Sequence, residues 1–168
     1  MLTLALPNEE ATTAFGARLA EALRGMTRGF FVTLQGELGA GKTTLVRGLL
    51  RQLGVQGAIR SPTYAVLETY PVALGCVHHL DWYRLASARD LESLGFRDLL
   101  AAGQWVFVEW PDRAPAVAAT ADLCIELRYA PAASADAQSA CSPEAGRSVT
   151  VSAQTPEGEQ VLKGLIAG

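Results

Sequence analysis

The sequence predicts an α/β domain in which helices flank a mainly parallel central sheet. Three neighbouring features support this prediction: a short apolar strand over residues 30–34, a glycine-rich loop, and leucines at helical spacing after the loop. In the loop, four residues separate Gly36 from Gly41-Lys42-Thr43, which is the phosphate-binding pattern. A strand, this loop and a helix in that order predict the P-loop NTPase fold.

The residue types in this loop suit a bound polyphosphate. Gly36, Gly39 and Gly41 let the backbone turn tightly and bring its N–H groups close to phosphate oxygens. Lys42 supplies a positive charge for the β- and γ-phosphates, and the Thr43 hydroxyl is placed to hold Mg²⁺. The loop residues expected to bind the nucleotide are Gly36, Gly39, Ala40, Gly41, Lys42, Thr43 and Thr44. The chain contains only two lysines, so a chance match to this pattern is rare.

Length and composition limit the remaining possibilities. The chain has 168 residues, a length typical of one domain, which we expect to span residues 1–168. Its net charge of −3 and its scattered arginines give no basic stripe, so we expect contact with nucleic acid only through a partner. Three widely spaced cysteines match neither a zinc site nor a disulfide framework. The absence of a secretory signal and of a membrane-length apolar run predicts a cytoplasmic protein.

The elements around the loop follow from local patterns. Leu2–Leu6 is expected to form an edge strand, and Asn8 is expected to cap a helix that ends at Gly25. Thr12 lies on this helix, where we expect it to face solvent. The helix that begins in the phosphate loop is expected over residues 42–53.

A short polar segment, Ser61-Pro62-Thr63, follows that helix. Pro62 keeps Ser61 out of helical geometry, so the segment is stiff. In several P-loop proteins a nucleotide-sensing switch lies at this place, which makes Ser61 and Thr63 candidate nucleotide contacts. A tight turn into a strand over residues 65–70 is an equally good interpretation.

The next strand is expected over residues 76–81, after a turn at 71–75, and it ends at Asp81. His78 and His79 are adjacent within it. Neighbouring residues of a strand point to opposite faces, so these two histidines are not expected to share a metal ion. Short helices are expected over residues 87–94 and 98–102.

Residues 104–109 form an apolar run without alternation that ends in Glu109. Such a run predicts a strand buried on both faces of a parallel sheet, and its carboxyl end lies at the ligand edge. Glu109 is therefore favoured for Mg²⁺, through a water molecule. Asp81 is expected to orient the attacking water or to add to the metal shell. The alternative for Asp81 is a surface ion pair with Arg84.

The C-terminal part predicts an antiparallel hairpin. Residues 123–129 and 147–153 alternate between apolar and polar side chains, which is typical of half-buried strands. The segment 130–145 is rich in alanine, serine and proline, and we expect it to be a mobile loop. Thr155-Pro156 is expected to start a last helix.

Four motifs, in this order and at this spacing, resemble one family. They are Leu38-Gly39-Ala40-Gly41-Lys42-Thr43-Thr44, Ser61-Pro62-Thr63-Tyr64, His79-Leu80-Asp81-Trp82-Tyr83-Arg84-Leu85 and Glu109-Trp110. The sequence is similar to the TsaE (YjeE) family, the bacterial ATPases of tRNA threonylcarbamoyladenosine biosynthesis. The resemblance covers roughly residues 6–129 and returns at Gly146-Arg147.

This resemblance implies a protein that binds ATP and Mg²⁺ and works with TsaB and TsaD. The resemblance implies that TsaD transfers a threonylcarbamoyl group to the adenosine beside the tRNA anticodon. It implies phosphate and Mg²⁺ contacts for Lys42 and Thr43, a metal-side role for Glu109, and a role in hydrolysis for Asp81. Thr12 falls near the N-terminal nucleotide contact of the family, so the resemblance also implies a nucleotide contact for Thr12.

Other classes of nucleotide-binding protein lack support. The sequence has no Asn-Lys-x-Asp motif for guanine and no Ser-Gly-Gly-rich transporter signature. It also has no arginine cluster for a kinase lid, although a small-molecule or nucleoside kinase that transfers the ATP γ-phosphate is the remaining alternative. We expect a monomer. We expect its ATPase activity to be weak without its partners, because no arginine finger is evident and the partners could supply or position one; Arg84 of the same chain is the rival candidate.

Overall fold

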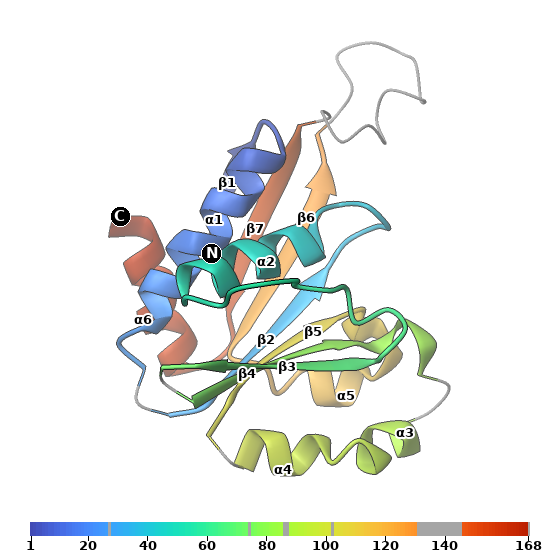
Figure 1. Cartoon of the computed structure of the whole chain (residues 1–168). Helices are drawn as coiled ribbons and strands as arrows, with labels where there is room; N and C mark the ends of the chain where they lie inside the picture. The colour runs from blue at the N-terminus through green and yellow to red at the C-terminus, as the bar shows by residue number, and fades with distance from the viewer. Residues whose placement is uncertain (27, 74, 86–87, 102, 131–145, 168) are drawn as a thin grey trace.

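A seven-stranded sheet lies between two layers of helices in the computed structural model (Figure 1). The structure describes residues 1–26, 28–73, 75–85, 88–101, 103–130 and 146–167, so the predicted mobile loop lies outside the described residues apart from residue 130. The elements, with η for 3₁₀ helices, are β1 (Leu2–Leu6), α1 (Glu9–Leu23), β2 (Phe30–Gln35), α2 (Lys42–Gln52), β3 (Leu67–Val72), β4 (Gly75–Asp81), η1 (Trp82–Arg84), α3 (Ala88–Ser93), α4 (Phe96–Ala101), β5 (Trp105–Glu109), η2 (Pro111–Arg113), α5 (Pro115–Ala118), β6 (Leu123–Tyr129), β7 (Arg147–Ala153) and α6 (Pro156–Ala167).

The sheet is mixed, with the strand order β1-β7-β6-β2-β5-β4-β3. The four central strands, β6, β2, β5 and β4, pair in parallel. The pairs β1–β7, β7–β6 and β4–β3 are antiparallel. The prediction of a mainly parallel sheet is therefore not confirmed. The sheet differs from this prediction at its edges. There, β3 and β4 are joined by a turn that is too short for a parallel crossover.

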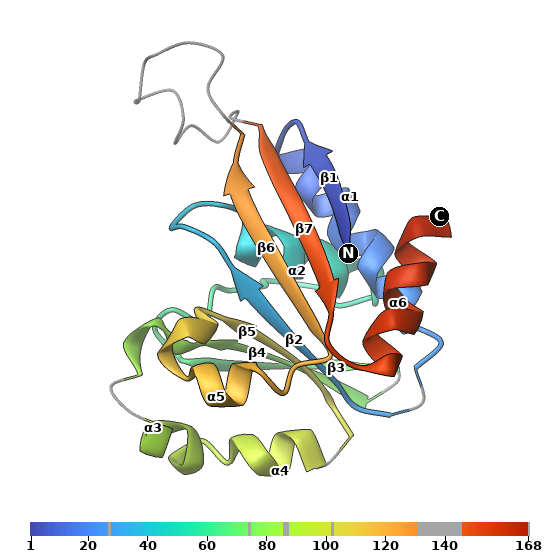
Figure 2. The same ribbon diagram turned by 180° about the vertical axis from the view of Figure 1, so that it is seen from behind.

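Helices α1, α2 and α6 cover one face of the sheet, and α3, α4 and α5 lie on the other (Figures 1 and 2). Strand β2 contributes to both cores. Phe30, Val32 and Leu34 pack toward α1, α2 and α6, whereas Phe31 packs toward the opposite helices. This double burial explains why the central strand is apolar without alternation.

Helices α1 and α2 touch backbone to backbone. A Cβ atom added at Gly16 would lie 2.1 Å from the Leu45 carbonyl oxygen, and one added at Gly48 would lie 2.2 Å from the Thr13 carbonyl oxygen. Only glycine fits at these two contacts. The first helix therefore fixes the position of α2, and with it the loop from which α2 begins.

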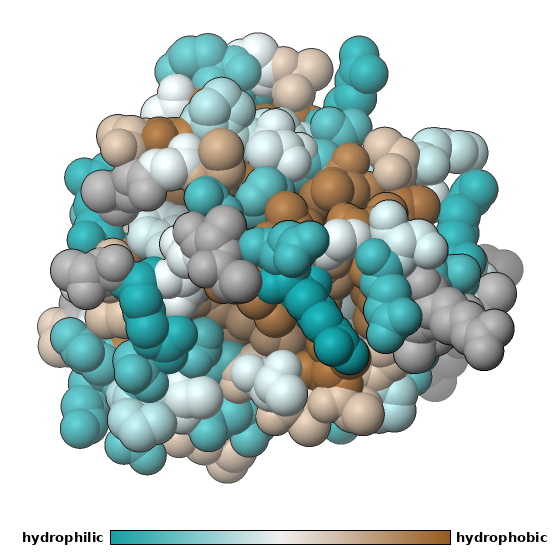
Figure 3. Space-filling view, turned by 90° about the horizontal axis from the view of Figure 1, so that it is seen from below, coloured by the Kyte–Doolittle hydropathy of each residue, from teal (hydrophilic) through white to brown (hydrophobic). Residues whose placement is uncertain are grey.

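The opposite layer consists of three short helices. Seen from the side of α3 and α4, apolar side chains show between hydrophilic ones (Figure 3). A groove between α3, α4 and α5 is lined by Leu91, Phe96, Leu100 and Val117, among others. These helices have only four to six residues each. None of the helices in the described residues has both the length and the apolar character needed to cross a membrane.

Most element bounds agree with the sequence-based expectations, and one strand is shifted. β1, β6 and β7 have the predicted bounds. β3 begins at Leu67 rather than at residue 65 because the Val66 N–H donates to the Pro62 carbonyl, 2.6 Å away, in a turn. Pro71 lies in this edge strand opposite Cys76, so the turn between β3 and β4 is shorter than expected.

Candidate functional site

The loop between β2 and α2 has the backbone that its glycines predict. Gly36, Gly39 and Gly41 have φ values of 142°, 78° and 105°, a region that side chains disfavour. Space is restricted as well, because a Cβ atom at Gly36 would lie 2.3 Å from the Leu127 carbonyl oxygen and one at Gly39 would lie 2.6 Å from the Tyr129 hydroxyl. The end of β6 therefore presses against the loop from outside.

Lys42 is buried at the first position of α2. Its Nζ donates to the carbonyl oxygens of Gly36 and Glu37 at 2.7 and 2.9 Å, and it lies 4.1 Å from the centre of the Trp110 ring. Burial lowers the pKa of Lys42, and the nearby carboxylates of Glu109 and Asp81 oppose this shift. The loop carbonyls and an aromatic face thus hold one ammonium group at the mouth of the loop.

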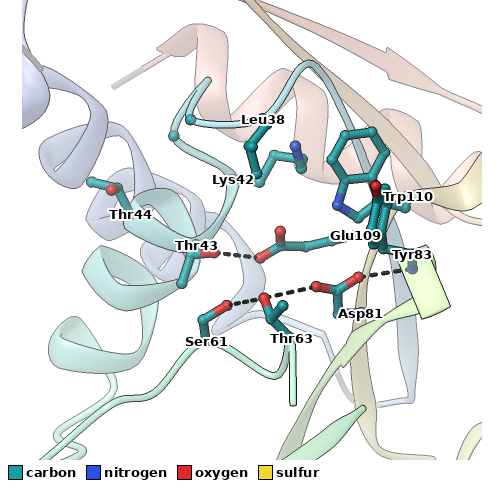
Figure 4. A pocket seen from close by; sticks show the side chains of 12 residues that line it. Leu38, Lys42, Thr43, Thr44, Ser61, Thr63, Asp81, Tyr83, Glu109 and Trp110 are labelled. Atoms are coloured by element: carbon teal, nitrogen blue, oxygen red, sulfur yellow. Dashed lines mark hydrogen bonds between the residues drawn. The ribbon is translucent and has the colours of Figure 1, made fainter. Parts of the chain in front are cut away.

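Glu109, at the end of β5, faces Thr43 at the start of α2 (Figure 4). The Thr43 hydroxyl donates to Glu109 Oε1 at 2.7 Å, and His79 Nε2 lies 2.9 Å from the same oxygen. Burial raises the pKa of Glu109, but the hydrogen bonds from His79 and Thr43 and the charge of Lys42 bring the pKa below its ordinary value. The Glu109 side chain is therefore a buried, ionised carboxylate at neutral pH.

Asp81 lies beside Glu109, because β4 and β5 are parallel and these two residues are paired in register. Asp81 Oδ1 accepts from the Tyr83 N–H at 2.8 Å, and Oδ2 accepts from the Thr63 hydroxyl at 3.0 Å. The Ser61 hydroxyl lies 2.7 Å from that of Thr63. The polar segment after α2 is thus connected to the second acid (Figure 4).

The alternative interpretation of Asp81, a surface ion pair with Arg84, is not seen. Asp81 is buried, and no ion pair joins it to Arg84 in the described part of the chain. The Arg84 guanidinium instead lies over the Tyr64 ring, 4.8 Å from its centre.

These side chains surround a cavity of about 340 Å³. The predicted site residues that line it are Gly39, Gly41, Lys42, Thr43, Thr44, Ser61, Thr63, Asp81 and Glu109. Leu38, Tyr83 and Trp110 complete the lining and give it apolar walls (Figure 4). Residues from the loop, the 61–63 segment and the ends of two parallel strands thus meet at one edge of the sheet.

Three predicted site residues, Thr12, Gly36 and Ala40, are not among those that line this cavity. The expectation that Thr12 faces solvent is wrong, since only 1% of it is exposed. Its hydroxyl donates to the Asn8 carbonyl at 3.2 Å, and its methyl group would lie 3.3 Å from a Cβ atom at Gly41. Thr12 is buried because α1 packs closely against α2 and the phosphate loop.

Sequence reasoning gave Trp110 no role in the site, although it was part of a quoted motif. Its φ of 60° is unusual for a bulky residue, and such backbone outliers are concentrated at functional sites. Its ring packs against Tyr83, with the ring centres 5.1 Å apart, and carries Lys42 on its face. An aromatic residue directly after a buried acid was the available signal.

The two adjacent histidines point to different partners, as strand alternation predicts. His78 Nδ1 lies 2.9 Å from the Thr69 hydroxyl on β3, whereas His79 contacts Glu109. Sequence reasoning rejected a shared metal site for the two histidines and placed His79 in a family motif, but it did not predict this contact.

The fold and the loop define an α/β protein with a phosphate-binding-loop site. Residues 6–137 match the family described as "Threonylcarbamoyl adenosine biosynthesis protein TsaE". A Haemophilus influenzae protein named tRNA threonylcarbamoyladenosine biosynthesis protein TsaE is 38% identical over 130 residues, which cover 76% of this chain and 82% of that protein. A Synechocystis protein of the same name is 40% identical over 114 residues, with coverages of 66% and 70%. The chain therefore belongs to the TsaE family.

A solved structure agrees at the level of the fold. The crystal structure of Bacillus subtilis YdiB superposes with a TM-score of 0.75 and covers 99% of this chain and 94% of that one. The sequence identity is 24%, so this likeness supports the shared fold alone.

Proposed function

We propose that this chain is a magnesium-dependent ATPase that acts in tRNA threonylcarbamoyladenosine biosynthesis together with TsaB and TsaD. One observation carries the proposal: a glycine loop, a buried lysine and a hydrogen-bonded pair of Thr43 and Glu109 line a single cavity. Family membership supplies the pathway, and this arrangement supports the nucleotide chemistry.

The loop binds the triphosphate. Backbone N–H groups around Gly39 and Gly41, at the start of a helix, favour an anion, and Lys42 adds a full positive charge. Thr44, one residue further along α2, also lines the cavity and contacts the phosphates nearer the nucleoside.

Thr43 and Glu109 fit a magnesium ion. A hydroxyl and a carboxylate are hard oxygen donors, and Mg²⁺ in nucleotide sites is held by one or two such groups together with phosphate oxygens and water. When bound, the ion neutralises charge on the phosphate oxygens. Glu109 is the metal-side acid in this proposal, in agreement with its place at the end of the most buried strand.

Asp81 positions the attacking water. It is buried at the cavity wall beside Glu109, and its hydrogen bond to Thr63 connects it to the 61–63 segment. A movement of the Ser61 and Thr63 hydroxyl groups on binding the terminal phosphate would therefore change the orientation of the Asp81 carboxylate.

The isolated chain is a slow ATPase. None of the described residues that line the cavity is an arginine, and an arginine finger contributes a factor of about 10³–10⁵ in other P-loop enzymes. TsaB and TsaD supply or position the missing group. The lack of an arginine cluster and the family membership both disfavour the kinase alternative. With a net charge of −3, the protein meets tRNA through its partners.

The test is to measure phosphate release from ATP with and without TsaB and TsaD. We expect hydrolysis to rise when the partners are added, and Lys42→Ala to abolish ATP binding in a calorimetric titration. Unchanged turnover in Lys42→Ala would remove the loop from the account. Transfer of phosphate to a small molecule would favour the kinase.

A further inference from the structure

His79 is a buried titratable group that the proposed function leaves without a role. It lies on β4, two residues before Asp81, and its side chain is 0% exposed. Burying an imidazole removes it from water, a cost that a specific hydrogen bond must offset. That bond goes to Glu109, with 2.9 Å between Nε2 and Oε1.

The protonation pattern of His79 follows from its surroundings. Nδ1 is buried and has no hydrogen-bond partner among the described residues, whereas Nε2 faces a carboxylate oxygen. A carboxylate only accepts, so Nε2 carries a proton and donates it to Glu109 Oε1. His79 thus orients the carboxylate group of Glu109.

His79 and Thr43 are connected because both hydrogen-bond to the same oxygen atom of Glu109. Glu109 Oε1 accepts from both His79 and Thr43, the latter at 2.7 Å. The second oxygen of Glu109 points away from Thr43, toward the side of the cavity where Lys42 lies (Figure 4). A hydroxyl has one proton and two lone pairs, so Thr43 can donate to Glu109 and still present a lone pair to the cavity. The direction of that lone pair depends on where Oε1 is held.

We propose that His79 is a positioning residue: its Nε2–H fixes Glu109 Oε1, which in turn orients the Thr43 hydroxyl toward the divalent cation. The proposal rests on the proposed function, because it assigns the cation site to Thr43 and Glu109. Partners of metal ligands in other proteins change metal affinity by about 10- to 100-fold when removed.

The chain offers a matched control one residue away. His78 is also buried on β4, but its Nδ1 lies 2.9 Å from the Thr69 hydroxyl on the other face of the sheet. His78→Leu therefore removes the same side chain from the same strand without touching Glu109.

The test compares ATP affinity with Mg²⁺ and with a chelator in wild type, His79→Leu and His78→Leu. We expect His79→Leu to raise the half-saturating Mg²⁺ concentration by about 10- to 100-fold and to leave affinity for metal-free ATP unchanged. His78→Leu should match wild type in both measurements. Equal loss of affinity with and without Mg²⁺ in His79→Leu would show a general structural role and overturn the proposal.

A second pair of variants covers the case in which His79→Leu does not fold. His79→Gln carries an amide N–H near the place of Nε2, whereas the shorter His79→Asn does not reach Glu109. Mg²⁺ dependence should be close to wild type in the glutamine variant and weakened in the asparagine variant. Identical Mg²⁺ dependence in these two variants would also overturn the proposal. If wild type itself binds no ATP, the proposed function fails instead.

Discussion

Two buried carboxylates lie at opposite ends of the central strands, and they are bonded in different ways. Asp122, just before β6, is fully engaged: Oδ1 accepts from Arg28 and Thr155 at 2.8 and 2.7 Å, and Oδ2 accepts from the Phe31 N–H at 2.9 Å. Glu109, at the end of β5, receives both of its hydrogen bonds on Oε1. Its second oxygen accepts none within the residues that the structure describes.

This difference in hydrogen bonding indicates that Asp122 stabilises the fold, whereas Glu109 belongs to a site that can bind a ligand. Asp122 ties the start of β2 to the start of α6, because Thr155 also accepts from the Gly158 N–H at 3.1 Å. With both oxygens occupied, Asp122 has little capacity left for a ligand. Glu109 is as well buried, yet it keeps one oxygen for a ligand in the cavity.

The contrast between Glu109 and Asp122 is tested most strongly by a substitution at Glu109, where we expect the largest effect. Glu109→Ala should lower ATP hydrolysis by about 10²-fold and raise the Mg²⁺ requirement, because the variant loses the group that orients Thr43. Asp81→Ala should lower hydrolysis with less change in the Mg²⁺ requirement. Phosphate release measured over a range of Mg²⁺ concentrations separates the two effects, and the reverse order would exchange the roles of the two acids.

Asp122 should show the opposite behaviour. Asp122→Asn should lower the free energy of unfolding by about 2 kcal/mol, because an amide N–H₂ group would face buried donors. The folded variant should bind ATP like wild type. Urea unfolding and a binding titration test both halves, with the exposed Asp112→Asn, expected within about 0.5 kcal/mol of wild type, as control. Lost ATP affinity with unchanged stability would contradict the distinction.

The smallest effect that we expect is a loss of folding stability at acidic pH, caused by protonation of Glu109. The hydrogen bonds and Lys42 outweigh burial, so the pKa of Glu109 is below its ordinary value of 4.5, and its ionised form stabilises the folded state at neutral pH. This stabilisation is fully present above about pH 4.5 and is lost as the pH falls toward the lowered pKa. In urea unfolding at a series of pH values, wild type should lose stability relative to Glu109→Gln below pH 4.5. Parallel pH profiles would mean that the charge of Glu109 is not stabilised by its neighbours.

Local sequence patterns were sufficient for the parts of the site that lie at the ends of apolar runs. The phosphate loop, Asp81 and Glu109 could be predicted because each follows a strand that is recognisable from its own residues. The antiparallel pairing of β1 with β7 could not, since an apolar run does not specify its partner or the direction of pairing. Thr12 was misplaced because its burial depends on α2 rather than on its own helix. Asp122 and His79 were missed because their partners lie 94 and 30 residues away.

The contact between Gly16 and the backbone of α2 has a consequence for how substitutions at Gly16 appear in genetic screens. Helix α2, which begins in the phosphate loop, packs so closely against Gly16 that even one methyl group at this position would collide with its backbone. An alanine there would therefore produce the phenotype of an active-site lesion from a residue that touches no ligand. Genetic screens that score loss of activity would recover this position alongside Lys42, although the two lie on different helices and perform unrelated tasks.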